Sequence, residues 1–497
     1  MIDYADADAT ELARRVRARE VSPAELVDHA IAAIERVNPK INAVVHRMYD
    51  EARAAAQATG ENALPDGPFP GVPMAVKDFD GFVKGVPWTA STRFLEGWIP
   101  TEDSEAITRL RRAGVVLMAK TNLPELAIVG TTESQWRGPA RNPWNLDHST
   151  GGSSGGSAAL VAARAVPVAH GGDGGGSLRI PASNCGLVGL KATRGRVPLG
   201  PHQGEGWGGY VQWGVLSRTV RDTAGFLDVL AGPMPGDPYS APPQERAYTL
   251  EIGAPTGRLR IGMSTRSFFG KDTHPECRKA AENAAKLLAD LGHDVEEAAP
   301  DIDRDGLVRA YLTQVGVGVA SEIEDMARWS GRTPTAALFE PATWFLRQVG
   351  LTMTGLELQH ARDAMQEAGR KTAAFHAKFD LFLGPTMAFP PVQIGELALK
   401  PAERAGLAAL RAVPIPAAIR AVLASLAANN FERTPNTQLF NQTGQPAISL
   451  PLHMTADGLP VGVQLAAAMG GEALLLRVAA QIEAAAPWIG RRPAVRA

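Results

Sequence analysis

Two glycine- and serine-rich loops carry the clearest sign of chemistry in this sequence. The first spans residues 151–157 (GGSSGGS) and the second spans residues 171–177 (GGDGGGS). Residues without a Cβ let backbone N–H groups converge on a developing oxyanion, and a serine beside them can act as a nucleophile. An isolated run of this kind is usually a flexible linker, but a linker needs neither Asp173 nor Arg179 at its exit. The N–H donors of the predicted oxyanion hole are Gly174, Gly175, Gly176 and Ser177.

Other chemistries of glycine-rich loops fit the sequence less well. Neither loop is followed by the Gly-Lys-Ser/Thr of a nucleotide-binding P-loop, and neither contains Gly-x-Gly-x-x-Gly. The first loop also matches the Gly-x-Ser-x-Gly elbow of α/β-hydrolases, which would make Ser154, or Ser153 in the preceding frame, the nucleophile. That arrangement requires a later acid and a histidine, and the candidate histidines stand in no recognisable catalytic context. They are His360, His376 and His453.

A lysine at the end of an apolar run is the other unusual feature. Lys77 follows residues 72–76 (VPMAV), so it is expected at the buried end of a strand. Burial disfavours the ammonium form of a lysine, which is the condition for a lysine to act as a base near neutral pH. The alternative is a structural ion pair with Asp78 or Asp173, and position alone favours that alternative.

Alternating strand and helix patterns must position these residues. Short apolar runs bounded by turn residues predict buried strands at residues 72–76, 115–119, 166–169, 261–263, 381–383, 448–452 and 461–466. Helical patterns occur at residues 104–113, 219–230, 275–291 and 474–485. The alternation predicts an α/β fold in which helices cover both faces of the sheet. Ser22 and Glu25 form a predicted capping box at the start of an earlier, N-terminal helix, and the proline-rich residues 233–255 and 385–416 are expected to be surface connections.

Composition narrows the class of protein. The chain has 497 residues, of which 45% are hydrophobic, and that is enough apolar material for a large core. A net charge of -2 argues against nucleic acid as a partner. We find neither a secretory signal nor a run of roughly 20 apolar residues, so we expect no membrane association and a cytoplasmic location. Cys185 and Cys277 are expected to be free thiols, and no metal-binding or cofactor motif is present.

The loop pair and the lysine together resemble the amidase signature family. The resemblance rests on motifs in order along nearly the whole chain, at residues 71–78, 120–125, 141–144, 150–182, 185–191, 383–386, 441–451 and 458–462. It implies one α/β domain over residues 1–497, with a central twisted mixed β-sheet covered by helices on both faces. The signature core is expected at about residues 66–200, after an N-terminal helical segment at about residues 1–65.

The resemblance also implies roles for individual residues. Ser177 corresponds to the family's nucleophile, Ser153 to the bridging serine that the family holds by a cis peptide, and Lys77 to the terminal base. The positions that support the site by hydrogen bonding are Ser154, Asp173 and Arg179, and those that line the substrate channel are Ala127, Ile128 and Val129. No cofactor or metal is implied, and the family suggests a homodimer. The sequence departs from the family pattern at Gly172, where threonine is usual, and at Ala192, where proline is usual.

The implied reaction is hydrolysis of an amide through an acyl-enzyme intermediate. The C-terminal stretch, residues 474–488, and residues 194–197 most resemble the members that hydrolyse the 6-aminohexanoate cyclic dimer, and general acylamidases share the same motifs. We therefore expect a small-molecule amide as the substrate. Two alternatives stay open: a glutamine-hydrolysing subunit of a transamidation complex, and a non-catalytic scaffold that retains the fold.

Overall fold

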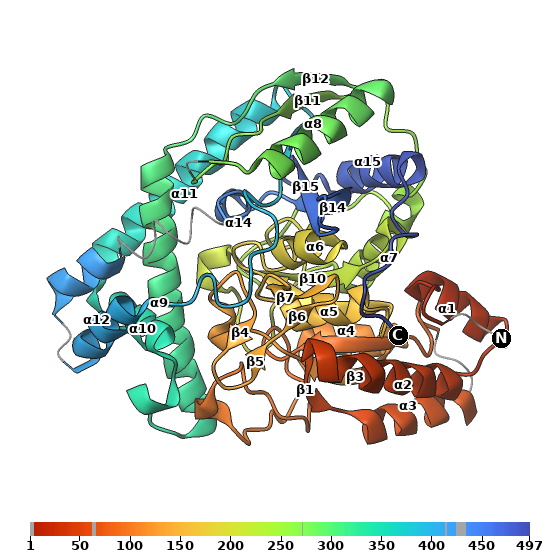
Figure 1. Cartoon of the computed structure of the whole chain (residues 1–497), viewed down its shortest axis with the longest axis horizontal. Coiled ribbons are helices and arrows are strands. Elements are labelled where there is room, and N and C mark those ends of the chain that lie inside the picture. The colour runs from red at the N-terminus through yellow and green to blue at the C-terminus, as the bar shows by residue number, and fades with distance from the viewer. Residues whose placement is uncertain (1–3, 62–65, 271, 413–414, 424–433) are drawn as a thin grey trace.

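A single mixed β-sheet organises the molecule (Figure 1). The structure is a computed structural model and describes residues 4–61, 66–270, 272–412, 415–423 and 434–497. Within these residues eleven strands form the sheet, in the order β1-β3-β2-β8-β10-β9-β14-β15-β13-β11-β12. Their bounds are β1 Val44–Arg47, β2 Pro73–Lys77, β3 Val116–Thr121, β8 Val168–Asp173, β9 Val188–Lys191, β10 Gln212–Ser217, β11 Arg260–Met263, β12 Asp294–Glu297, β13 Leu381–Pro385, β14 Ala447–Met454 and β15 Pro460–Ala467.

Both parallel and antiparallel pairs occur in this sheet. Strands β3, β2 and β8 are parallel neighbours, as are β13, β11 and β12, whereas β10, β9, β14 and β15 join them by antiparallel pairs. Two short hairpins lie outside it, β4 (Glu133–Ser134) with β5 (Gly138–Pro139) and β6 (Arg141–Asn142) with β7 (Asn145–Ser149). The single-domain α/β fold predicted from the sequence is confirmed.

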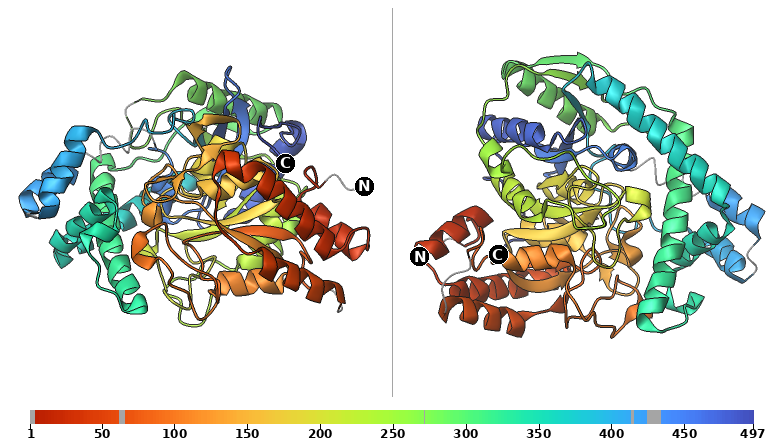
Figure 2. Two further views of the ribbon diagram at one scale, coloured as in Figure 1. Left: turned by 60° about the horizontal axis from the view of Figure 1, so that its bottom comes forward. Right: turned by 180° about the vertical axis from the view of Figure 1, so that it is seen from behind.

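Helices flank the sheet, as Figures 1 and 2 show. Their bounds are α1 Ala9–Arg17, α2 Pro23–Ile41, α3 Tyr49–Glu61, α4 Glu105–Arg112, α5 Gly155–Ala162, α6 Arg179–Cys185, α7 Val220–Leu230, α8 Pro275–Asp290, α9 Arg304–Ser330, α10 Pro341–Thr352, α11 Gly355–His376, α12 Pro401–Ala412, α14 Gln438–Thr443 and α15 Glu472–Ala485. Helix α2 begins with the predicted capping box, in which the Ser22 and Glu25 side chains bond each other's backbone N–H groups. The domain boundary expected near residue 65 falls outside the described residues.

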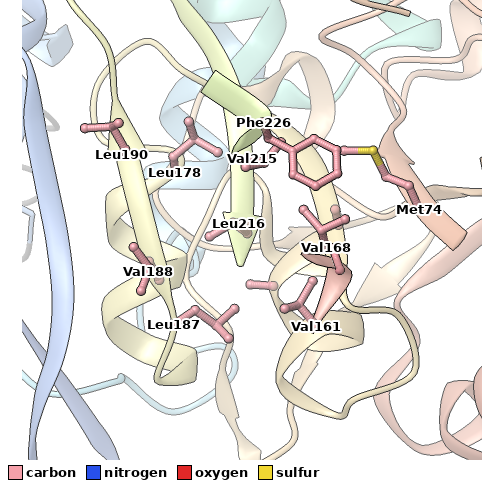
Figure 3. Packing of buried hydrophobic residues seen from close by; sticks show 14 of the residues in the cluster. Met74, Val161, Val168, Leu178, Leu187, Val188, Leu190, Val215, Leu216 and Phe226 are labelled. Carbon is pink, nitrogen blue, oxygen red and sulfur yellow. The ribbon is translucent and has the colours of Figure 1, made fainter. Parts of the chain in front are cut away.

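The main core lies between the strands and the helices that pack on them. Figure 3 shows this packing, in which side chains from four neighbouring strands meet side chains from α5 and α7. Examples are Met74, Val168, Val188, Leu216, Val161 and Phe226. All are 0% exposed, and burying a side chain of this size fully contributes roughly 1.5–3 kcal/mol. Helix α5, which follows the first glycine-rich loop, and strand β8, which leads into the second, are therefore anchored in this core.

A helical arm stands beside the sheet and was not evident from the sequence. Figure 1 shows α9 along one side of the molecule, with α10 and α12 beside it. Apolar side chains of α10 and α12 form a separate cluster, which includes Phe345, Val349 and Leu407. Helix α12 lies within residues 385–416, so the prediction of a plain surface connection there was wrong. The prolines of this segment indicated a connection, but Pro401 stands at the first position of α12, where proline is compatible with a helix.

The two ends of the chain lie on the same side of the molecule (Figures 1 and 2). Arg492 Nη2 lies 2.6 Å from Asp6 Oδ1, and Arg164 Nη1 donates to the same oxygen at 2.7 Å. Cys185 and Cys277 are both buried free thiols, as predicted. Among the helices of the described residues, none is both long and apolar enough to cross a bilayer.

Candidate active site

Lys77 is the last residue of β2, and it points at the first glycine-rich loop. Its Nζ donates to Ser153 Oγ at 2.9 Å, and both side chains are buried, at 1% and 0% exposure. Strand β2 runs parallel to β8, with Ala75 opposite Ala169. The carboxyl ends of the two strands therefore meet at one edge of the sheet, where ligands bind in open α/β folds.

An acid that the sequence analysis missed is the ion-pair partner of Lys77. The Nζ atom lies 2.6 Å from Asp80 Oδ2, and Asp80 is 4% exposed. Neither of the two predicted partners contacts the lysine in this way. Asp78 faces Lys120, whose Nζ is 3.5 Å from Asp78 Oδ1, and Asp173 pairs with Arg179. The expectation that an ion pair would involve Asp78 or Asp173 was therefore wrong.

The first glycine-rich loop runs from β7 into α5 and holds both candidate serines. The Gly152–Ser153 peptide bond is cis, in agreement with the position at which the family resemblance placed such a bond. The next serine, Ser154, is 0% exposed, and its Oγ donates to Gly172 O at 3.3 Å. Its backbone N–H donates to Ser177 O at 3.3 Å, so the two loops are joined directly. Ser154 thus links the two glycine-rich loops by hydrogen bonds.

None of the three candidate histidines, His360, His376 and His453, has a hydrogen bond to Ser154 among the described residues. His453 Nε2 bonds Glu276 Oε2 at 2.7 Å, and His376 Nδ1 bonds Phe379 O at 3.1 Å. His360 lies on the exposed side of α11. Each of these rings is committed elsewhere or faces solvent, and a Ser-His-acid triad requires hydrogen-bond contact between its members.

A buried ion pair fixes the second glycine-rich loop. Arg179 Nη2 donates to Asp173 Oδ1 at 2.9 Å and its Nε donates to Asp173 Oδ2 at 3.0 Å. Asn441 Nδ2 adds a bond of 2.8 Å to Asp173 Oδ1, and Gln464 Oε1 accepts from Arg179 Nη1 at 2.7 Å. Burial alone would raise the pKa of Asp173, but Arg179 and Asn441 outweigh it and lower this pKa to about 2. The carboxylate therefore stays ionised, and it holds the loop in one conformation.

The predicted oxyanion hole contains one donor that the Asp173 carboxylate already binds. Gly176 N–H donates to Asp173 Oδ1 at 2.7 Å, and it is therefore already occupied. Gly176 has φ 128°, and a Cβ there would lie 2.3 Å from Thr437 Oγ1, so only glycine fits this turn. Gly175 and Ser177 line the adjacent cavity. The predicted oxyanion-hole donors that remain are the N–H groups of Gly174, Gly175 and Ser177.

A cavity of about 220 Å³ opens beside Ser177. Ala127, Ile128 and Val129 line it, in the place where the resemblance put the substrate channel. The opposite wall comes from the helical arm, with Tyr311 and Val315 on α9 and further residues on α10. The remaining described lining residues are Gly130, Ile180, Trp207, Leu312, Ala342, Phe345, Leu346, Leu397, Leu399, Leu423, Thr434 and Gln438. None of these described residues carries a charged side chain.

Several residues that shape the site escaped the sequence analysis. Asp80 stands three residues after Lys77, and that spacing was its only signal. Asn441 and Gln464 lie more than 260 positions from Asp173 along the chain, and only the folded sheet brings them to Arg179. Trp207 lines the cavity from the connection that precedes β10.

Metal chemistry receives no support from the side chains described. In the ranges that the structure describes, no group of three or more His, Cys, Asp or Glu residues is arranged to hold an ion. The polar groups on and beside the two joined loops are instead the hydroxyls of Ser153 and Ser177, the amine of Lys77 and backbone N–H groups. Such a set suits nucleophilic acyl transfer.

Comparison with known proteins identifies the family. The family model described as Amidase matches residues 25–476. The chain is 41% identical over 493 residues to the 6-aminohexanoate-cyclic-dimer hydrolase of Pseudomonas sp. (strain NK87), and the match covers 98% of this chain and 96% of that protein. The same enzyme of Paenarthrobacter ureafaciens is also 41% identical over 493 residues.

Solved structures agree with this assignment. The structure of 6-aminohexanoate cyclic dimer hydrolase complexed with substrate has a TM-score of 0.89 and 40% identity, and the match covers 99% of this chain and 100% of that one. A bacterial aryl acylamidase of the amidase signature family has a TM-score of 0.86 and 27% identity, over 99% of both chains. With a full-length family match and these neighbours, the chain belongs to the amidase family of amidase signature enzymes and hydrolyses amides.

Proposed function

We propose that the substrate is an uncharged small-molecule amide, linear or cyclic, whose acyl chain occupies the cavity beside Ser177. The observation that carries this proposal is the lining of the cavity, in which the described residues include many aliphatic side chains and no charged one. An ionised group buried there without a partner would cost several kcal/mol. The cyclic dimer of 6-aminohexanoate, for which the matched hydrolases are named, is an uncharged amide and meets this requirement.

The proposed mechanism is a proton relay through three side chains. Lys77 in its neutral form accepts the proton of Ser153, which in turn accepts the proton of Ser177, and the Ser177 oxygen attacks the amide carbonyl. The 2.9 Å contact between Lys77 Nζ and Ser153 Oγ supports the first link. The bond from Ser154 N–H to Ser177 O supports the second link, because it holds the two loops against each other.

Backbone donors and the returning proton complete the reaction. We assign the oxyanion to the N–H groups of Gly174, Gly175 and Ser177, and loss of one such donor in other hydrolases costs roughly 3 kcal/mol of barrier. The relay then returns its proton to the leaving nitrogen, because an amide anion is too poor a leaving group to depart unprotonated. Water hydrolyses the acyl-enzyme by the same route in reverse. No cofactor takes part in this scheme.

The two alternative functions are less well supported. Glutamine carries an ammonium and a carboxylate, and the described lining offers neither of them a charged partner. A glutamyl-tRNA(Gln) amidotransferase chain from Thermotoga maritima has a TM-score of 0.74 at 24% identity, which shows a shared fold alone. A scaffold without activity would not need to retain Lys77, Ser153 and Ser177 together, with Lys77 and Ser153 in hydrogen-bond contact.

Covalent labelling tests the relay. A fluorophosphonate should add to the wild-type protein once, as seen by intact mass, and the adduct should disappear in Ser177→Ala. Ser154→Ala is the matched control: it removes a hydroxyl from the same pair of loops and should still be labelled. Labelling that survives Ser177→Ala and is lost in Ser154→Ala would overturn the assignment in favour of the elbow. No labelling of any variant would revive the scaffold hypothesis.

A matched pair of substrates tests the proposed substrate class. The cyclic dimer of 6-aminohexanoate and its linear dimer share the same repeating unit, but the linear form carries a charge at each end. We expect turnover of the cyclic dimer and of an uncharged acyl anilide, with kcat/KM for the linear dimer and for glutamine lower by roughly 100-fold or more. Glutamine turnover above that of the anilide would contradict the proposal.

Homodimerisation and a cytoplasmic location are further proposals, and they rest on the resemblance and on the sequence. Light scattering coupled to size-exclusion chromatography should give twice the mass of the chain. Fractionation of the source cells should leave the activity in the cytoplasm.

A further inference from the structure

We propose that Asp80 is a fourth member of the relay, a positioning residue that orients Lys77 and stabilises the ammonium that forms on it. This inference rests on the roles proposed above for Lys77, Ser153 and Ser177. In a nucleophile–base pair the base is usually oriented by a third group, as the aspartate of a Ser-His-Asp triad orients its histidine. Asp80 stands in that relation to Lys77.

The contact geometry supports this role. Nζ of Lys77 lies between two oxygens, Ser153 Oγ at 2.9 Å and Asp80 Oδ2 at 2.6 Å. When the proton of Ser177 passes to Ser153 and that of Ser153 passes to Lys77, a positive charge appears on Nζ. Asp80 takes no part in these proton transfers. The charge that forms is therefore neutralised at the place where it appears, in a site from which water is excluded.

The turn after β2 holds Asp80 in this position. Lys120 Nζ donates to Gly81 O at 3.1 Å, and Gly81 N–H donates to Phe79 O at 2.9 Å. Asp80 is flanked on both sides by residues whose backbone is fixed in this way. The Asp80 side chain is only 4% exposed, so its carboxylate cannot turn outward into solvent.

Gly172 provides the space that Asp80 occupies. A Cβ on Gly172 would lie 2.4 Å from Asp80 Oδ1, a distance that requires one of the two groups to move. Gly172 lies inside β8, between residues paired with β10, so its backbone has little freedom to shift. The sequence departs from the family at this residue, where threonine is usual. The departure and the acid at position 80 thus form one feature of this chain.

The other titratable groups around Lys77 and Asp80 lie on β3, β8 and α9. On β3, Lys120 faces Asp78. On β8, burial together with Lys120 and Lys77 lowers the pKa of His170 to about 3, so that ring is neutral. On α9, burial raises the pKa of Glu322 to about 8, with a further contribution from Asp80. Glu322 lines a second cavity, of about 40 Å³, on whose wall Asp80 also lies.

The test compares two ways of removing Asp80 from Lys77 with one control. Asp80→Asn keeps the shape and removes the charge, and Gly172→Ala places a methyl group against the carboxylate. Glu322→Gln removes a proton-binding group from the same cavity without a contact to Lys77. For each variant, kcat, KM and the rate of fluorophosphonate labelling are measured on the full chain from pH 5 to pH 10, and the fold is checked by circular dichroism.

We expect Asp80→Asn to lower kcat at least about 100-fold with KM little changed. The positive charge on Lys77 that Asp80 stabilises forms during the reaction and not during substrate binding. The acid limb of the pH profile should move to lower pH, since the loss of a buried negative charge disfavours the protonated form of any basic group beside it. Gly172→Ala should change kcat and the position of the acid limb in the same directions as Asp80→Asn. If Asp80→Asn does not fold, Gly172→Ala tests the role of Asp80 by itself. Glu322→Gln should leave the acid limb in place.

Two results would overturn the inference. One is an Asp80→Asn variant that keeps both its kcat and its acid limb. The other is an acid limb that moves as far in Glu322→Gln as in Asp80→Asn. Either result leaves the proposed function standing provided that Ser177→Ala still abolishes labelling, whereas labelling that survives Ser177→Ala defeats the relay itself.

Discussion

The charged edge of the sheet and the apolar cavity beside it are built in opposite ways. On the edge, Lys77 pairs with Asp80 and Arg179 pairs with Asp173, all four side chains being buried. The cavity wall has no charged side chain among its described residues, and much of it comes from α9 and α10. The difference teaches that chemistry and selection of the substrate are assigned to separate parts of the chain, and a variant in one part should leave the task of the other intact.

The largest effect is expected when the base on the charged edge is removed. Lys77→Ala should lower amide turnover by roughly 10²- to 10⁴-fold, the usual contribution of a general acid–base group. Turnover of an ester of the same acyl group should fall less in this variant, because its leaving alkoxide needs less protonation than an amide nitrogen. The ratio of kcat/KM for the amide and the ester measures this. A parallel loss for both substrates would contradict a role in protonating the leaving group.

The next largest effect is expected on stability, from the other buried pair. Arg179→Met leaves the Asp173 carboxylate without its main partner and should lower the free energy of unfolding by about 3–5 kcal/mol. Denaturation in urea measures the change. The control is Arg258→Gln, because Arg258 is 74% exposed in its ion pair with Asp294 and its loss should leave the midpoint unchanged. Equal shifts in the two variants would show that burial does not decide the strength of these pairs.

A smaller, pH-dependent effect is expected where the cavity wall meets the helical arm. Glu125 opens the turn that leads to Ala127, and it accepts from the N–H of Glu340, the residue that precedes α10, at 2.7 Å. Burial, together with Glu340, raises the pKa of Glu125 to about 7. The folded protein therefore binds this proton more tightly than the unfolded chain does. Its stabilising contribution is complete below about pH 4.5 and is lost as the pH rises through about 7.

Glu125→Gln should abolish that loss, because glutamine keeps an acceptor for the Glu340 N–H and does not ionise. We expect the wild type to lose up to about 3 kcal/mol relative to the variant between pH 4.5 and pH 8. Urea denaturation of both proteins at the two pH values gives the difference. A constant difference across this range would show that Glu125 does not titrate there.

The smallest effect is expected from a charge placed in the cavity itself. Gln438 lines the cavity, and its Nε2 donates to Thr434 Oγ1 at 3.2 Å. Gln438→Glu keeps the size of the side chain, and its carboxylate should lower kcat/KM for an uncharged anilide about tenfold by opposing the developing oxyanion. Gln366→Glu, on the exposed side of α11, is the matched control and should change nothing. A drop in the control, or none in Gln438→Glu, would break the contrast between the two regions.

The sequence allowed much of the charged edge and the sheet to be predicted. Seven apolar runs predicted seven strands, among them β2 and β8, because strands buried on both faces leave continuous apolar runs. Lys77, Ser153 and Ser177 were predicted from local motifs and the family resemblance, and the structure brings Lys77 into contact with Ser153. The lining by Ala127, Ile128 and Val129 was also placed correctly, from the resemblance alone.

What could not be predicted depends on contacts between distant segments. The Gly176 N–H was assigned to the oxyanion because nothing local indicates that the Asp173 carboxylate turns back to accept it. Asp80 was overlooked because a carboxylate three residues after a lysine in an extended segment has no fixed direction until the turn is known. The cavity wall from Tyr311 and Phe345 follows from the packing of α9 and α10, which depends on tertiary contacts rather than on a local pattern.

One edge of the sheet has a consequence for how the protein behaves when it is concentrated. Among the residues that the structure describes, strand β12 pairs with β11 alone, and it carries Asp294, Glu296 and Glu297 in four residues. An open edge offers unpaired backbone groups to any strand of another molecule, and short, charged edge strands discourage such pairing. Two copies that met through β12 would bring six carboxylates together. We therefore expect this short, charged strand, in which Asp294 and Glu296 also pair with Arg258 and Arg260, to disfavour aggregation without any part in catalysis.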